Sequence, residues 1–235
     1  MPSVKQRRAG LSALNDEVIG CARCCRLVAH RQKVSAEKRR AYHDCEYWGK
    51  PVPGFGDPNA RLLLVGLAPG AHGANRTGRV FTGDRSGDWL YRALYRAGFA
   101  SRAQSRSADD GMHLRGAFIT CAARCVPPGN RPTPQELLAC RPFLIRELEL
   151  LPRLKAIVGL GQIGFDSVLR TFAERGVDLP KPRPRFAHGC ETKLGARQPI
   201  LLGSYHPSQQ NTLTGRLTEP MFDRIFSRVR DLLES

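Results

Sequence analysis

The sequence predicts an α/β fold in which a four-stranded, mainly parallel sheet is covered by helices on both faces. The first observation is a set of four short apolar runs, each bounded by turn-forming residues: 61–69, 116–122, 154–159 and 199–205. The second is a set of helical patterns that separate or follow these runs: 87–97, 134–150, 162–174 and 219–233. Strands that alternate with helices form βαβ units, which build parallel sheets. With no internal repeat, residues 1–235 are expected to form a single domain.

The segments outside this alternation are predicted from their composition. The N-terminal segment, 1–58, is basic and helix-like up to about Arg40, and it ends in the loop PVPGFGDP. One helix start is well marked, because Thr133 can cap it, Pro134 occupies the first helical position and Glu136 completes a capping box. Residues 176–198 are predicted to form a long basic loop, which either contacts DNA or is simply a solvated surface loop.

The charge of the chain points to a polyanionic partner. Lys and Arg total 37 against 21 Asp and Glu, a formal net charge of +16. Such an excess attracts phosphate backbones over long range, although a merely soluble basic protein is the alternative. No apolar run approaches the roughly 20 residues that span a bilayer, and the N-terminus lacks the apolar region of a secretory signal. We therefore expect a protein without a membrane partner, cytoplasmic or nucleoid-associated.

The eight cysteines are expected to be metal ligands or buried thiols, because disulfides are rare in a reducing compartment. Cys21 and Cys24 form a CxxC pair, and Cys125 and Cys140 form a second pair across CVPPGNRPTPQELLAC. Four thiolates in two pairs fit a [4Fe–4S] cluster or a tetrahedral zinc ion, and their spacing does not choose between the two. Cys25 is the rival of Cys24. The remaining cysteines are interpreted as structural thiols: Cys45, Cys121 and Cys190.

The residues that follow the first strand are candidates for ligand binding, because open parallel sheets bind ligands at the carboxyl ends of their strands. The stretch GLAPGAHGANRTGRVFTGD has neither the GxGxxG spacing of dinucleotide sites nor a phosphate loop. Its tight turn can bring backbone close to a flat ligand, on which Phe81 could stack. Asp84 precedes a helix, where a carboxylate can act in catalysis or merely cap the backbone amides.

A histidine ends the fourth strand and a polar segment follows it. His206 can be a catalytic group at this edge or only a hydrogen-bonded structural residue. The segment SQQNTLT supplies short polar donors for phosphate oxygens. Leu213 is the one apolar residue there, and it can either fill the gap left by an extruded base or anchor the loop to the body.

Four motifs in order resemble the family 5, or type B, uracil-DNA glycosylases of bacteria and archaea. They are CARCCRLVAHR…YWGKPVPGFGDP, GLAPGAHGANRTGR…FTGD, CVPPGNRPTP…C and HPS…NTLTGRLT. The resemblance covers nearly the whole chain. It implies a three-layer α/β/α sandwich around a four-stranded parallel sheet, and a [4Fe–4S] cluster bound by Cys21, Cys24, Cys125 and Cys140. It also implies hydrolysis of the N-glycosidic bond of uracil in DNA, and of other deaminated bases such as hypoxanthine, to leave an abasic site.

The chain departs from the general uracil-glycosylase pattern at two positions. The turn Gly66-Leu67-Ala68-Pro69-Gly70 lacks the acidic or amide residue that often positions water, which is the type B departure. Where family 4 has a uracil-reading Asn after the second strand, this chain has Cys121, which agrees with a less discriminating pocket. The loss of the polar group in the first turn is the best support for the alternative, a non-catalytic iron–sulfur DNA-binding protein. A small-molecule nucleoside enzyme on the same α/β plan fits the +16 charge poorly.

The resulting prediction divides the site into three groups. Catalysis is assigned to His206, which stabilises the departing base anion, to Asp84, which positions water, and to Asn130, which contacts the base or that water unless it is only a turn residue. The predicted base-binding residues are Gly66, Leu67, Ala68, Gly70, His72, Asn75 and Phe81. The predicted DNA-binding residues are Ser208, Asn211, Leu213, Thr214 and Arg216.

Overall fold

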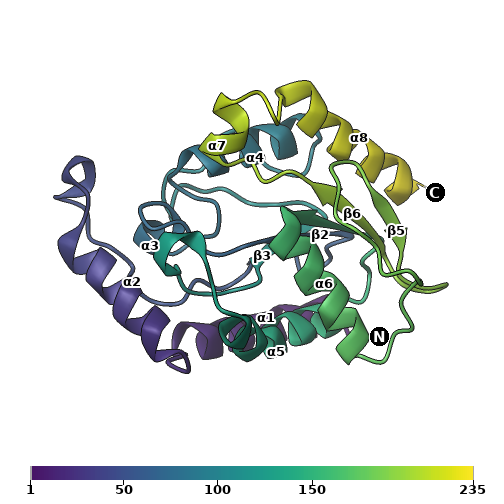
Figure 1. Ribbon diagram of the computed structural model, residues 1–235, viewed down its shortest axis with the longest axis horizontal. Coiled ribbons are helices and arrows are strands. Elements are labelled where there is room, and N and C mark those ends of the chain that lie inside the picture. Colours follow the sequence, from purple (N-terminus) through teal and green to yellow (C-terminus); the bar gives the residue numbers. More distant parts are fainter. Residues whose placement is uncertain (1, 235) are drawn as a thin grey trace.

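The computed structural model describes residues 2–234 and contains one mixed sheet between two layers of helices (Figure 1). The strand order is β1-β3-β2-β4-β6-β5. The four inner strands are parallel: β3 (Ala117–Cys121), β2 (Leu62–Gly66), β4 (Ala156–Leu160) and β6 (Ile200–Ser204). The predicted α/β class and the parallel core are therefore confirmed.

The predicted strand count of four is wrong, because a short antiparallel strand closes each edge of the sheet. β1 (Phe55–Gly56) pairs with β3, and β5 (Glu191–Lys193) pairs with β6. Two or three residues are too few to create an apolar periodicity, and both strands lie within segments that resemble loops in the sequence. The predicted loop 176–198 thus contains a strand.

Alternate residues of the inner strands face opposite layers, as the pleat of a strand requires. Leu62 and Leu64 pack in one core with α4 (Arg85–Arg96) and α8 (Glu219–Glu234). Leu63 and Val65 pack in the other core, which α1 (Val4–Ile19), α5 (Pro134–Leu150) and α6 (Gln162–Glu174) complete. Helix α2 (Cys25–Glu37) extends away from the sheet, past the short helix α3 (Ala74–Thr77) (Figure 1).

The local signals at the helix ends act as the sequence predicts. The Thr133 hydroxyl accepts a hydrogen bond from the Glu136 amide at 3.2 Å, and the Glu136 carboxylate accepts one from the Thr133 amide at 2.7 Å. The polar segment after His206, expected to be a loop, instead forms helix α7 (Gln209–Leu213), which Ser208 caps. The one-turn helices η1 (Arg40–Tyr42) and η2 (Pro128–Asn130) complete the chain. Within residues 2–234, none of the helices combines the length and the apolar content needed to cross a bilayer.

Candidate active site

The carboxyl ends of the parallel strands bring three distant segments to one edge of the sheet. Gly66 pairs in register with Cys121, and Leu160 pairs with Ser204. The Ala122 amide donates to the Gly66 carbonyl at 2.9 Å, so the β2 and β3 connections stay together beyond the sheet. The structure thus places the first predicted motif beside the segment that follows β3.

Phe81 covers the end of β2. Its ring lies so close to Gly66 that a Cβ at Gly66 would be 2.9 Å from two ring carbons. Phe81 is buried and has a φ of 52°, a value that side chains rarely adopt. The turn is held from the other side by Gly87, where a Cβ would be 1.8 Å from the Phe81 carbonyl oxygen. Only glycine at these two positions allows the aromatic ring to lie on the backbone.

Asp84 caps α4 with one carboxylate oxygen and faces the glycine-rich turn with the other. Its Oδ1 accepts a hydrogen bond from the Gly87 amide at 2.9 Å, which confirms the capping role. A Cβ at Gly70 would lie 2.7 Å from Oδ2, and one at Gly73 would lie 1.9 Å from it. Burial raises the pKa of the Asp84 carboxyl above its usual value. Capping therefore leaves one oxygen of Asp84 against the motif that was predicted to bind the base.

His206 lies across the same edge, against Phe81. The two ring centroids are 5.7 Å apart and the rings are inclined by 32°. Burial lowers the pKa of His206 to about 4, so the ring is neutral at pH 7. Among residues 2–234, no hydrogen bond is formed by either of its ring nitrogens. A neutral imidazole in this position can donate one N–H to a ligand.

The backbone around His206 is fixed by residues on both sides. The Asn211 side-chain amide donates to the His206 carbonyl at 2.8 Å. Gly161, with a φ of 83°, starts the turn into α6, and a Cβ there would be 3.4 Å from the His206 Cβ. The Tyr205 amide donates to Nδ1 of His188 at 3.1 Å, and the two rings stack at 5.0 Å. The segment 176–198 thus packs against the strand end that carries His206.

The predicted DNA-binding residues occupy α7 and its ends. The Ser208 hydroxyl accepts from the Asn211 amide at 3.4 Å, and the Thr214 hydroxyl donates to the Gln210 carbonyl at 2.6 Å. The Arg216 guanidinium lies 4.7 Å from the centroid of the Tyr205 ring. Leu213 is 72% exposed, so it does not anchor this segment to the body. Several of the polar groups predicted to contact phosphate therefore also hold the local backbone.

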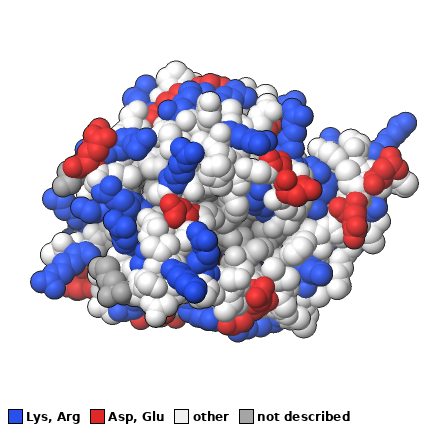
Figure 2. All heavy atoms as spheres, turned by 180° about the vertical axis from the view of Figure 1, so that it is seen from behind, with Lys and Arg blue, Asp and Glu red and all other residues white. Residues whose placement is uncertain are grey.

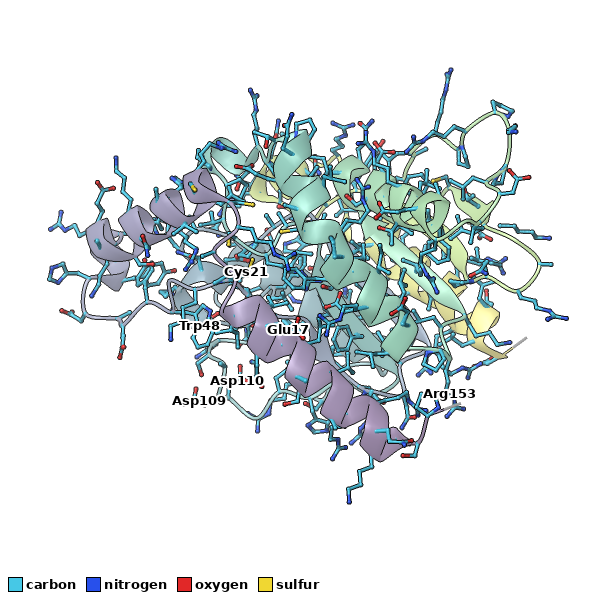
Figure 3. The ribbon with its side chains drawn as sticks, turned by 90° about the horizontal axis from the view of Figure 1, so that it is seen from below. Glu17, Cys21, Trp48, Asp109, Asp110 and Arg153 are labelled. Carbon is cyan, nitrogen blue, oxygen red and sulfur yellow. The ribbon has the colours of Figure 1, made fainter. Side chains whose placement is uncertain are left out.

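Packing between α1 and α5 brings two of the four predicted cysteine ligands toward each other. Leu14 and Val18 of α1 pack with Phe143 of α5, which brings Cys21, just after α1, toward Cys140. Glu17 on α1, which Figure 3 shows beside α5, pairs with Arg146 at 2.5 and 2.7 Å.

The start of α2 is joined to the start of α5 in a similar way. The Arg26 guanidinium donates to both carboxylate oxygens of Glu136, at 2.8 and 2.7 Å, close to Cys24, the N-terminal cap of α2.

The other three of these cysteines influence the pKa of Cys125. Burial raises the pKa of Cys125 to about 12, and Cys140, Cys21 and Cys24 act in the same direction. Figure 3 shows sulfur atoms gathered near Cys21. None of the cysteines forms a disulfide, and Cys25 is exposed. Within the described part of the chain, no three Cys, His, Asp or Glu side chains are grouped closely enough to hold a single metal ion.

Comparison with known proteins identifies the family. A model of the uracil DNA glycosylase superfamily matches residues 53–230. The chain belongs to this superfamily. It is 51% identical to the type-5 uracil-DNA glycosylase of Mycobacterium tuberculosis over 220 residues, which are 93% of this chain and 80% of that protein. The type-5 enzyme of Thermus thermophilus is 49% identical, with 90% and 93% of the two chains covered. That of Pyrobaculum aerophilum is 42% identical, with 91% and 89% covered.

The family assignment confirms the resemblance seen in the sequence. Three of the predicted site residues lie away from His206. Asn75 is fully buried, and its amide is directed to α2, 3.4 Å from the Ser35 hydroxyl. Nδ1 of His72 lies 3.0 Å from the Tyr47 hydroxyl. Asn130 is exposed in η2 with a φ of 57°, a conformation that Asn tolerates in turns. The structure does not bring these three side chains into contact with His206.

The structure also identifies site residues that the sequence did not single out. Gly73 makes room for Asp84, Gly161 makes room for His206, and Tyr47 contacts His72. The two glycines lie in Gly-rich strand ends, but the sequence does not tell which glycine faces which side chain. Asn211, a predicted DNA contact, also orients the His206 backbone through its side-chain amide.

Proposed function

We propose that this uracil-DNA glycosylase releases the base by using His206 as a neutral hydrogen-bond donor to the departing base. Cleavage of the N-glycosidic bond leaves negative charge on the base and positive charge on the sugar. The proposal is supported by the position of the His206 ring beside Phe81, which covers Gly66. The ring is neutral, and within residues 2–234 its nitrogens form no hydrogen bond. A preorganised donor in a desolvated site stabilises developing charge more than water does.

Asp84 supplies the second part of the proposed mechanism. Its Oδ1 is fixed by the Gly87 amide, and its Oδ2 faces Gly70 and Gly73. In this place an ionised carboxylate would hold the attacking water and stabilise the cationic sugar. Asn130 is a weaker candidate, because its exposed position supports a role only if DNA binding brings it toward the site. Asp84 therefore carries the water-positioning role in the proposal.

The exposed Leu213 and the basic surface support a proposed mode of DNA binding. A base reaches such a site only after it leaves the helical stack, at a cost of roughly a few kcal/mol. Leu213, 72% exposed at the end of α7, would enter the gap that the base leaves. Figure 2 shows Lys and Arg side chains scattered over the face seen from behind, with Asp and Glu among them. Together with the +16 charge, the basic side chains support association with DNA and residence on the nucleoid.

A [4Fe–4S] cluster bound by Cys21, Cys24, Cys125 and Cys140 is part of the proposal. Four thiols from two segments form a donor set suited to iron or zinc. Bound there, a cluster would supply cross-links between α1, α2, α5 and the segment after β3, and no step of base release uses it. Iron and acid-labile sulfide analysis of the purified protein tests this assignment, and zinc without sulfide would contradict it.

We also propose that the pocket accepts deaminated bases other than uracil, such as hypoxanthine. Cys121 ends β3 beside Gly66, and a Cβ at Gly66 would lie 3.4 Å from its sulfur. Burial raises the pKa of the Cys121 thiol to about 12, so it remains a neutral and weakly polar group. Such a group gives little hydrogen-bond selection between a pyrimidine and a purine edge.

A base-release assay on duplexes with one modified base tests these proposals. The wild-type protein, incubated with uracil-containing DNA and then with alkali, is expected to give strand cleavage at uracil. Hypoxanthine duplexes are expected to be cleaved as well, and Cys121→Asn to favour uracil over hypoxanthine more strongly. Strand cleavage without alkali would contradict a monofunctional hydrolase. DNA binding without any base release would support the non-catalytic reading instead.

A further inference from the structure

Two buried arginines lie among the cysteines. Arg124 immediately precedes Cys125 and is 1% exposed. Arg31 lies on α2, two turns after Cys24, and is 7% exposed. Arginine is rarely buried unless its charge and its N–H groups are satisfied. The groups that satisfy the charge and the N–H donors of each arginine therefore have to be identified.

Their hydrogen bonds account for only part of each guanidinium. Nη2 of Arg124 donates to Oε2 of Glu147 at 2.7 Å, whereas its Nε and Nη1 have no partner. Nη1 of Arg31 donates to the Gly49 carbonyl at 2.5 Å, and its Nε has no partner. Buried donors without an acceptor are costly, and a native structure that keeps several of them calls for an explanation. An acceptor that binds between them would provide it.

Both arginines act electrostatically on cysteines of the proposed ligand set. The positive charge of Arg124 acts on Cys140, and that of Arg31 acts on Cys125. The two arginines differ in the net positive charge that they contribute near the cysteines. Glu147 is 1% exposed and offsets the charge of Arg124. Within residues 2–234, Arg31 has no carboxylate partner, so it contributes a full positive charge.

We propose that Arg31 and Arg124 are positioning residues for the iron–sulfur cluster, with their free N–H groups directed to its sulfur atoms. The inference rests on the cluster assigned under the proposed function. A [4Fe–4S]²⁺ core with four thiolates carries two negative charges, and reduction adds a third. Arg31 then offsets part of that charge, whereas Arg124 supplies mainly hydrogen-bond donors because Glu147 neutralises it.

The test uses the full-length protein and substitutions at Arg31. Arg31→Gln removes the charge but keeps N–H donors, and Arg31→Lys keeps the charge. Lys33→Gln is the matched control, since it removes one positive charge from the exposed side of the same helix. Three quantities are measured: iron and sulfide per chain, the reduction potential of the cluster, and the rate at which an oxidant bleaches the absorption of the cluster at about 400 nm.

Arg31→Gln is expected to lower the equilibrium constant for one-electron reduction of the cluster about tenfold. This corresponds to a reduction potential that is more negative by about 59 mV. Bleaching is expected to be several-fold faster, while Arg31→Lys and Lys33→Gln resemble wild type. Full iron content with unchanged potential and bleaching in Arg31→Gln would overturn the inference. If that variant loses the cluster during purification, retention by Arg31→Lys supports the inference and loss by both variants refutes the role of charge.

Arg124 is tested by a substitution that leaves its charge in place. Arg124→Lys is expected to retain the potential but bleach faster, because the shorter ammonium that pairs with Glu147 cannot replace the Nε–H and Nη1–H of the guanidinium. Unchanged bleaching would count against the role of Arg124. Wild-type protein without iron and sulfide would remove both the inference and the cluster. Base release by the same preparation is measured separately, and it tests the proposed glycosylase function independently of the cluster.

Discussion

Substitution of Gly73 by alanine tests whether the position of Asp84 controls base release. The new methyl group would lie 1.9 Å from Oδ2 of Asp84, so the carboxylate must move by about 1.5 Å to reach an ordinary contact of 3.4 Å. An alanine methyl group at Gly70 would lie 2.7 Å from Oδ2 of Asp84, so the carboxylate would have to move by only about 0.7 Å. Since a displacement of 1 Å at a reacting group can cost on the order of 10²-fold in rate, Gly73→Ala should slow release by about 10²-fold or more, and Gly70→Ala by clearly less.

The assay is single-turnover release of uracil, with binding to uracil-containing DNA measured in parallel. Gly73→Ala also weakens the cap of α4, worth about 1 kcal/mol, which lowers Tm by roughly 2–4 °C in a chain of this size. Gly195→Ala is the control, because its nearest contact is a flexible Gln198 carbon at 3.3 Å.

A double-mutant cycle separates the effect on Asp84 from general damage. Asp84→Ala alone should abolish most base release while DNA binding remains. Added to Asp84→Ala, the Gly73→Ala substitution should then cost almost nothing more, because the group it displaces is gone. If the two losses simply multiply, Gly73 does not act through Asp84 and the reasoning fails.

Four further predictions follow from the burial or exposure of single side chains. His206→Ala should slow uracil release by about 10²-fold or more, and a smaller loss would assign the main donor elsewhere. Because the folded-state pKa of His206 is about 4 and the unfolded value about 6.5, the unfolded chain binds more protons between these values. Wild type should thus lose up to about 3 kcal/mol more than His206→Gln as pH falls from 6.5 to 4, measured by urea unfolding. Leu213→Ala should leave Tm unchanged and slow release from U·A more than from U·G, and equal effects would argue against a wedge. Glu147→Leu should cost about 3–5 kcal/mol of unfolding free energy, because it leaves the Arg124 charge buried and unpaired, and a loss below about 1 kcal/mol would contradict that.

The sequence by itself determined the parallel core, the helix starts and the edge of the sheet at which the candidate site lies. Apolar runs that alternate with helical patterns leave few other arrangements, and strand ends can be located along the chain. The same local signals marked Asp84 and His206, because each follows or precedes a regular element. The edge strands β1 and β5 escaped prediction, since two or three residues carry no periodicity of their own.

Only the tertiary structure decided which groups meet. Gly73 faces Asp84 across the turn that leads into α4, and Asn211 holds the His206 carbonyl. The ring of Phe81 meets that of His206, which lies far from it in the sequence. The protonation state of His206 was fixed in the same way. An imidazole in water would be close to half protonated near pH 6.5, and it is the burial beside Phe81 that keeps this ring neutral. Desolvation is a property of the packed molecule, and no stretch of the sequence contains it.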